Sequence, residues 1–241
     1  GLADAVSNDQ LALTLVDITD PENPKVASVN GDKMYYAASL PKIAILLGAF
    51  VEIEHAKLEL TDKLWIDMNL MIRKSSNAAA TRVLDTIGRD RLLEILQSPQ
   101  YALYNPDRNG GLWVGKPYSS ASAYKRDPLN NLSHGATAMQ TARFYYLLET
   151  NQLVSVDMTE KMKQVLVNPA ITHKFVKGLK SVPDLTLYRK SGSWKQYHAD
   201  SIMVDAKGHK YIIVGLTQNW DGDEWLEKLA LPLHNMITNT Q

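Results

Sequence analysis

Two segments of the chain, Ser39–Lys42 and Ser122–Lys125, have the pattern Ser-x-x-Lys, which can place an amine beside a hydroxyl. The sequence contains no cysteine, so a nucleophile has to come from another residue type, such as serine, threonine or lysine. On a helix, residues three apart share a face, and a lysine removed from water has a lowered pKa and can act as a base.

Context separates the two segments. Ser39 stands where a long apolar helix is expected to begin, close to backbone amides and the positive end of the helix dipole. Ser122 lies in a serine-rich stretch that no apolar helix follows. We therefore expect Ser39 to be the nucleophile and Lys42 its base. The alternative is that Ser39 is only an N-cap.

A second pattern, Ser75-Ser76-Asn77, follows Lys74 where another helix is expected to open. A hydroxyl with an amide two residues later can pass a proton along and hold a substrate amide. Serine and asparagine are also preferred helix caps, so the pattern alone leaves both interpretations open. The same spacing occurs at residues 28–30.

A third pattern, Lys190-Ser191-Gly192-Ser193, lies at the end of an apolar run. On a strand, the lysine and the glycine share one face, and the missing glycine side chain lets a substrate lie against the backbone. The lysine would attract a carboxylate, and an amide after the glycine could face an oxyanion. The alternative is an ordinary strand with a surface lysine and a turn.

The elements that must position these patterns follow from the apolar periodicity. It predicts strands at residues 11–18, 25–29, 186–190, 199–205 and 211–217, and helices at 40–56, 61–72, 77–86, 89–97, 136–148, 158–166 and 223–237. Residues 98–133 are expected to form a long, functional loop.

The order of these elements indicates one antiparallel sheet built from both ends of the chain, with an all-helical unit inserted. We expect a sheet domain of residues 1–38 and 186–241, a helical domain of residues 39–185, and an active site at their seam.

Composition narrows the class of protein. The 241 residues include 26 basic and 26 acidic side chains and 45% hydrophobic residues, which is typical of a globular fold and not of a nucleic-acid binder. The longest near-apolar stretch, Ile43–Val51, is too short to span a membrane, and no signal peptide is visible. The six histidines have no metal-ligand spacing, so we expect no metal.

The three patterns, in this order, form the set found in class A β-lactamases and penicillin-binding proteins. With the stretch MIRKSSNAAATRVLDTIGRDRL, the chain resembles the penicillin-recognising serine hydrolases, and most of all class A β-lactamases. The resemblance covers nearly the whole chain. It implies an α/β (α+β) fold, in which a five-stranded antiparallel sheet is flanked by helices and carries an inserted all-helical domain, with no cofactor.

The resemblance also implies roles. Ser39 would attack the acyl carbonyl, Lys42 would act as the general base, and Ser75 would pass a proton to the leaving nitrogen. Asn77 would hold Lys42 and the substrate. The remaining implied residues bind the substrate. Lys190 and Ser191 would bind its carboxylate, and Gly192 would let it lie against the backbone of the strand. The backbone amides of Ser39 and Ser193 would bind the oxyanion.

Three features depart from class A enzymes. Ser76 stands where the family usually has aspartate, and the stretch from Lys42 to Ser75 is shorter than usual. The third is the absence of the Ω-loop glutamate that activates the deacylating water: no glutamate occurs between Glu94 and Glu149. Gly110, or alternatively a position within residues 119–122, would take its place. The acids there are Asp107 and Asp127.

We therefore expect a monomeric serine acyl-transfer hydrolase that forms an acyl-enzyme with small β-lactams or related amides and esters and deacylates slowly. A D-alanyl-D-alanine carboxypeptidase or esterase, or a non-catalytic binding homologue, is the alternative. We expect a periplasmic or secreted protein. His134 and His198 are the histidines expected nearest the cleft, and four aromatics are candidates to line it: Trp113, Tyr118, Tyr124 and Trp194.

Overall fold

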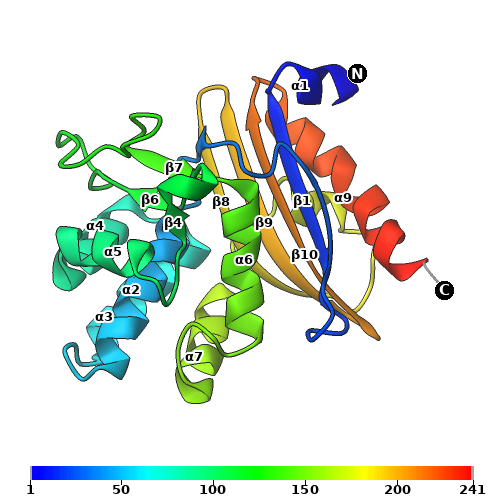
Figure 1. Ribbon diagram of the computed structural model, residues 1–241. Coiled ribbons are helices and arrows are strands. Elements are labelled where there is room, and N and C mark those ends of the chain that lie inside the picture. The colour runs from blue at the N-terminus through cyan, green and yellow to red at the C-terminus, as the bar shows by residue number, and fades with distance from the viewer. Residues whose placement is uncertain (1, 240–241) are drawn as a thin grey trace.

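The computed structural model describes residues 2–239, which fold around a five-stranded antiparallel sheet (Figure 1). The strand order is β2-β1-β10-β9-β8, so strands from both ends of the chain pair in the middle of the sheet. The strands are β1 (Leu11–Asp17), β2 (Lys25–Val29), β8 (Thr186–Trp194), β9 (Tyr197–Ala206) and β10 (His209–Gln218). The predicted fold class is confirmed.

Helices cover both faces of this sheet (Figure 1). On one side lie α2 (Lys42–Glu54), α3 (Asp62–Arg73), α4 (Asn77–Ile87), α5 (Arg89–Gln97), α6 (Ala138–Glu149) and α7 (Val156–Leu166). On the other lie α1 (Leu2–Ser7), α8 (Phe175–Gly178) and α9 (Gly222–Thr238). Within residues 2–239, every helix is too short or too polar to cross a lipid bilayer.

The two faces of the sheet pack against two separate hydrophobic cores, as strand β10 shows. Ile212 and Val214 pack with the α2 side, whereas Tyr211 and Ile213 pack with the α9 side. Alternate residues of a strand point to opposite faces, so a strand covered on both sides is apolar along its length.

Helix α2 is the centre of the larger core, because its residues from Lys42 to Glu52 are all buried. A helix that is apolar all round belongs inside a fold. A side chain at Gly48 would begin 2.8 Å from Leu92 on α5, so this glycine lets the two helices approach closely. The first turn of α2, residues 42–45, is fully buried as well, so it lies deep inside the molecule.

The stretch 98–133 is more ordered than the predicted loop. It contains the short elements β4 (Tyr104–Asn105), η1 (Pro106–Arg108), β5 (Gly110–Gly111) and β6 (Trp113–Val114). Strand β7 (His134–Ala136) then pairs with β6 and with β3 (Tyr35–Tyr36). These two- and three-residue strands are too short to produce a periodic pattern in the sequence.

Two predicted boundaries move in ways that matter for the site. Helix α2 begins at Lys42 rather than Leu40, so Ser39 lies in the turn before the helix. Strand β8 continues past Lys190 to Trp194, so the Lys-Ser-Gly-Ser pattern lies inside the strand. Glycine and serine weaken a strand pattern, but pairing with β9 extends the strand through them.

Candidate active site

The Ser39 hydroxyl lies beside the Lys42 amine at the start of α2. Lys42 Nζ donates a hydrogen bond to Ser39 Oγ over 3.1 Å. The N-cap residue of α2 is Pro41, and no side chain makes a capping hydrogen bond there. The capping alternative for Ser39 is therefore wrong. The Ser39 hydroxyl instead accepts a hydrogen bond from Lys42.

Lys42 is fully buried among neutral partners. Its Nζ also donates to Asn77 Oδ1 and to the Ser75 carbonyl oxygen, each over 2.7 Å, and lies 3.4 Å from Ser75 Oγ. Burial lowers the pKa of Lys42 to about 7, because the charged ammonium loses its hydration. A large share of this amine is thus uncharged near neutral pH, which lets it accept a proton.

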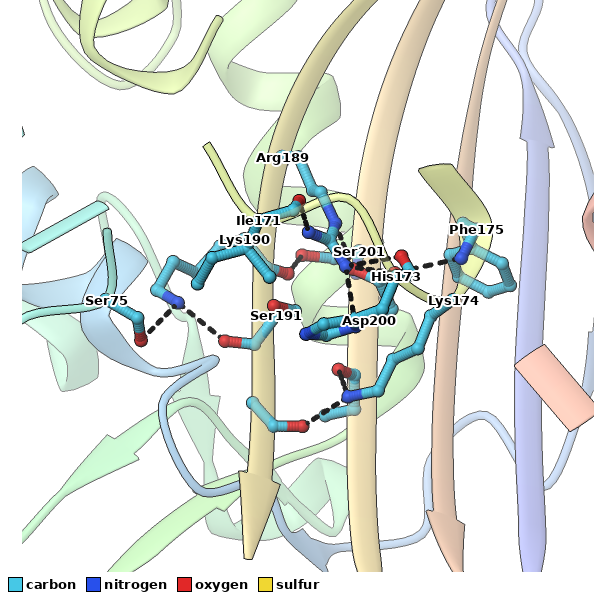
Figure 2. A network of polar contacts seen from close by, with 12 residues as sticks. Ser75, Ile171, His173, Lys174, Phe175, Arg189, Lys190, Ser191, Asp200 and Ser201 are labelled. Atoms are coloured by element: carbon cyan, nitrogen blue, oxygen red, sulfur yellow. Dashed lines mark hydrogen bonds and ion pairs between the residues drawn. The ribbon is translucent and has the colours of Figure 1, made fainter. Parts of the chain in front are cut away.

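Two adjacent serines divide the work at the start of α4. Ser76 is the N-cap, and its hydroxyl accepts a hydrogen bond from the Ala79 amide over 3.2 Å. Ser75 takes the left-handed conformation, with φ of 56°. Its hydroxyl accepts a hydrogen bond from Lys190 Nζ over 3.0 Å (Figure 2). The capping role therefore falls to Ser76, and Ser75 Oγ faces the two lysines.

Lys190 reaches this hydroxyl from β8, one of the two edge strands of the five-stranded sheet. The side chain is buried, and its Nζ also donates to the Ser191 carbonyl oxygen over 2.6 Å. Burial first, and then the positive charges of Lys42 and Arg189, hold the pKa of Lys190 well below its usual range. The surface-lysine alternative is wrong.

Gly192 brings β8 directly against the turn that holds Ser39. A Cβ at this position would lie 2.3 Å from the Ala37 carbonyl oxygen and 2.7 Å from the Ser39 amide nitrogen. Only glycine fits such an approach without a shift of backbone. The backbone of β8 therefore lies close to the Ser39 amide, and the next residue, Ser193, is exposed.

A small cavity of about 190 Å³ opens beside these residues. Its wall includes Asn77 from α4 and Trp194 from the end of β8, whose side chain is 58% exposed. Tyr36 from β3, His134 from β7 and five residues of the loop complete it: Lys116, Pro117, Tyr118, Ser119 and Ser133. Among residues 2–239, no group of three or more His, Asp or Glu side chains is placed to hold a metal ion.

The sequence matches the profile of the β-lactamase enzyme family over residues 2–69 and 65–237. The chain belongs to this family. Comparison with curated proteins gives no significant match.

Solved structures of two β-lactamases and of PBP-A share this fold. A β-lactamase from Sphaerobacter thermophilus is 18% identical, with 98% of this chain and 96% of that chain covered and a TM-score of 0.75. A β-lactamase from Chitinophaga pinensis is 11% identical, with 98% of this chain and 96% of that chain covered and a TM-score of 0.74. A mutant of PBP-A, described as an acyl-enzyme complex with penicillin G, is 15% identical, with 96% of this chain and 94% of that chain covered and a TM-score of 0.73.

In this β-lactamase-family chain, Tyr118 covers the Lys42 amine. The ring centroid of Tyr118 lies 4.5 Å from Lys42 Nζ, and its hydroxyl donates to the Ala38 carbonyl oxygen over 3.2 Å. Burial raises the pKa of Tyr118 well above its ordinary value. The sequence named Tyr118 only as one of four aromatics for the cleft, because nothing in its neighbours indicates contact with Lys42.

His134 supports Tyr118 from behind. The two rings lie 4.3 Å apart, and His134 Nε2 donates to the Lys116 carbonyl oxygen over 3.0 Å while Nδ1 lies 3.3 Å from Ser133 Oγ. Burial lowers the pKa of His134 to about 4, so the ring is neutral near pH 7. Both ring nitrogens have hydrogen-bond partners, so the ring is held in place, and it forms part of the cavity wall.

Neither of the two aspartates of the loop lines the cavity. The Asp127 carboxylate accepts hydrogen bonds from the amides of Leu129, Asn130 and Leu132 and from the Tyr104 hydroxyl. Asp107 is exposed in the short helix η1. Asp127 is buried and thus holds the loop together through these hydrogen bonds.

The other candidates from the sequence have structural places. Ser122 and Lys125 are both exposed. Trp113 Nε1 donates to the Lys125 carbonyl oxygen, and the Tyr124 hydroxyl to that of Val114, so these aromatics hold the loop rather than line the cavity. The hydroxyls of Ser28 and Thr14 are hydrogen-bonded to each other, and the Asn30 side-chain amide donates to the carbonyl oxygens of Val6 and Leu11. Gly110 packs against Met34. His198 on β9 is the strand partner of Ser193 on β8.

Proposed function

We propose that this chain is a serine acyl-transfer hydrolase that forms an acyl-enzyme on Ser39 with β-lactams or related amides and esters. The observation that carries the proposal is the Lys42 amine, buried without a carboxylate partner in its hydrogen bonds and 3.1 Å from the Ser39 hydroxyl. A neutral amine at this distance can take the hydroxyl proton as oxygen attacks.

Acylation would begin with this proton transfer. Ser39 Oγ forms a bond to the acyl carbon while its proton moves to Lys42 Nζ, and the carbonyl oxygen becomes an oxyanion. The backbone amides of Ser39 and Ser193 are the proposed oxyanion donors, and the close packing of Gly192 against the Ser39 amide supports this pairing.

The Ser75 hydroxyl would complete acylation. It gives its proton to the leaving nitrogen as the carbon–nitrogen bond breaks, and it regains a proton from Lys42 or Lys190, which both lie within 3.4 Å of Ser75 Oγ. Asn77 would hold the substrate amide. Lys190 and Ser191 would bind the substrate carboxylate.

Hydrolysis of the acyl-enzyme would be slow. A general base typically contributes about 10²–10⁴-fold to such a step. In the loop of residues 98–133, Asp127 is engaged by the loop amides, and Tyr118 rather than a carboxylate lies over Lys42. Acylation therefore has its groups in place, whereas a water attacking the ester lacks an evident base.

Intact-mass analysis after incubation with a panel of β-lactams tests the proposal. We expect one adduct per chain that persists, and a burst of about one equivalent with a reactive chromogenic cephalosporin before a slow steady state. Fast turnover of benzylpenicillin without a burst would show that another group replaces the glutamate. Absence of any adduct would contradict the proposed function.

The aromatic wall of the cavity also suits peptide or ester substrates, so a carboxypeptidase or esterase activity is the second candidate. Release of D-alanine from a D-alanyl-D-alanine peptide, faster than release of hydrolysed β-lactam, would favour it. We further propose that the enzyme acts as a monomer in the periplasm or outside the cell, which fractionation and light scattering can check.

A further inference from the structure

A third buried lysine, Lys174, lies behind the part of β8 that faces Ser39. Lys174 directly precedes α8, and its side chain is only 1% exposed. Its Nζ donates to the Gly192 carbonyl oxygen over 2.7 Å, to Ser193 Oγ over 2.8 Å and to the Ala199 carbonyl oxygen over 3.0 Å. All three protons of the ammonium are therefore used, and all point at the end of the β8–β9 pair.

The nearby acid is already matched with another cation. Arg189 Nε donates to Asp200 Oδ1 over 2.8 Å, and both groups are buried (Figure 2). The Asp200 carboxylate also accepts from the amides of Phe175 and Ser201. Lys174 hydrogen-bonds two carbonyls and a hydroxyl instead, so its positive charge is directed at the backbone of β8 and β9.

The carbonyl that Lys174 binds shares a peptide group with the Ser193 amide. A hydrogen bond from an ammonium draws electron density toward the Gly192 oxygen, which makes the Ser193 N–H a stronger donor. That N–H is one of the two oxyanion donors of the proposed acyl transfer. A fixed charge one peptide away from the developing oxyanion acts without reorganisation during the reaction.

We propose that Lys174 is a positioning residue that polarises the Gly192–Ser193 peptide and so strengthens the oxyanion site used by Ser39. This inference rests on the proposed function. It assigns to Lys174 a task that the three sequence patterns do not contain, because the residue lies 18 positions before Gly192 in a segment without a motif.

The charge of Lys174 can be changed by pH, so the proposal can be tested by titration. Burial, and to a lesser degree Arg189, lowers the pKa of Lys174 to about 8, while Asp200 and Asp223 act in the opposite direction. The neighbouring His173 and His198 have pKa values lowered mainly by burial and stay neutral above pH 7. As pH rises through about 8, Lys174 loses its proton and the polarisation weakens.

The test compares Lys174→Met and Lys174→Arg with Lys177→Met, a matched control at an exposed lysine that pairs with Glu227. The readouts are the acylation rate with a chromogenic cephalosporin and the infrared stretch of the acyl-ester carbonyl, which reports hydrogen bonding in the oxyanion site. We expect Lys174→Met to slow acylation about 10–100-fold and to shift the carbonyl band to higher frequency. Lys174→Arg should keep both near wild type, as should Lys177→Met.

A purely structural role would lower the melting temperature without moving the carbonyl band of the folded acyl-enzyme. An unchanged band and rate in Lys174→Met would overturn the inference. If Lys174→Met does not fold, the wild-type band should rise in frequency as pH passes about 8, and the same titration of Lys174→Arg should be flat. Equal titrations in the two proteins would overturn it too. Failure of wild type to form any adduct on Ser39 would instead contradict the proposed function.

Discussion

The segments Ser39–Lys42 and Ser122–Lys125 share one pattern and differ in almost everything else. Lys42 is fully buried and donates to the Ser39 hydroxyl, whereas Ser122 and Lys125 are both exposed in the loop. The backbone of Lys125 helps to hold that loop, since its carbonyl accepts a hydrogen bond from Trp113. Burial, and not spacing, is what turns a lysine into a candidate base.

The largest expected effect is on the nucleophile. Ser39→Ala should abolish labelling by penicillin or a fluorophosphonate, because no other described hydroxyl receives a hydrogen bond from Lys42 at comparable distance except that of Ser75. Ser122→Ala is the matched control and should label like wild type. Peptide mapping of the adduct decides the matter. Labelling that survives in Ser39→Ala, or that maps to Ser122, would break the comparison.

The next effect is on the base. Lys42→Ala should slow acylation by several orders of magnitude, of which general-base catalysis itself accounts for about 10²–10⁴-fold. Lys125→Ala should leave the rate unchanged, because its amine lies in solvent. Stopped-flow acylation measures both. A similar loss in the two variants would mean that burial does not distinguish them.

Lys190→Ala sharpens the comparison with a second buried lysine. Substrates that carry a carboxylate should lose about 10–100-fold in kcat/KM, which corresponds to one hydrogen bond to a charged group. Esters without a carboxylate should lose less, since they lack that contact. Kinetics with a matched pair of substrates gives the ratio, and equal losses would contradict the carboxylate-binding role.

The pH dependence of acylation follows from the lowered pKa of Lys42, about 7. Only the neutral amine accepts a proton, and its fraction grows as pH rises through that value. The acylation rate should therefore fall about tenfold for each pH unit below about 6 and level off between about 7 and 8, above which loss of the Lys174 proton should lower it again. Rates measured in buffers of constant ionic strength check this. A profile without this limb would remove Lys42 from the base role.

The smallest effect concerns the cap of α4. Ser76→Ala should lower the free energy of unfolding by about 0.5–2 kcal/mol, because the Ala79 amide loses its acceptor. Its acylation rate should stay near wild type. Ser75→Ala should do the reverse, with a large loss of acyl transfer. Urea titration and stopped-flow kinetics of the two variants separate capping from catalysis.

The sequence was sufficient for the five strands of the main sheet and most helices, because apolar periodicity marks elements such as α2 and β10 clearly. It also selected the residues that the structure brings together around Ser75. It could not distinguish a cap from a proton donor at Ser75 and Ser76, because both uses favour the same residue type. The hydrogen bonds of the folded chain show that Ser76 is the cap and that Ser75 Oγ lies beside Lys190 instead.

Two contacts had no signal in the sequence. Tyr118 reaches Lys42 from 76 positions later (118 − 42), and Lys174 reaches Gly192 from before β8. Such contacts depend on how loops cross the fold, which local propensity does not encode. The turns of the 98–133 loop were missed for a related reason. They are fixed by Asp127 and Trp113 rather than by periodic apolar residues.

The anchoring of that loop has an evolutionary consequence. Asp127 and Trp113 hold its end and its body by hydrogen bonds that do not involve the stretch 119–122, which is exposed and of which Ser119 lines the cavity. Substitutions there leave the core of the fold untouched, so selection can sample new side chains at this edge of the cavity at little cost in stability. Under the proposed function, the residues that form the acyl-enzyme and the stretch beside which a deacylating base could arise lie on separate parts of the chain. The lifetime of the acyl-enzyme could then change in evolution while the acylation step is kept.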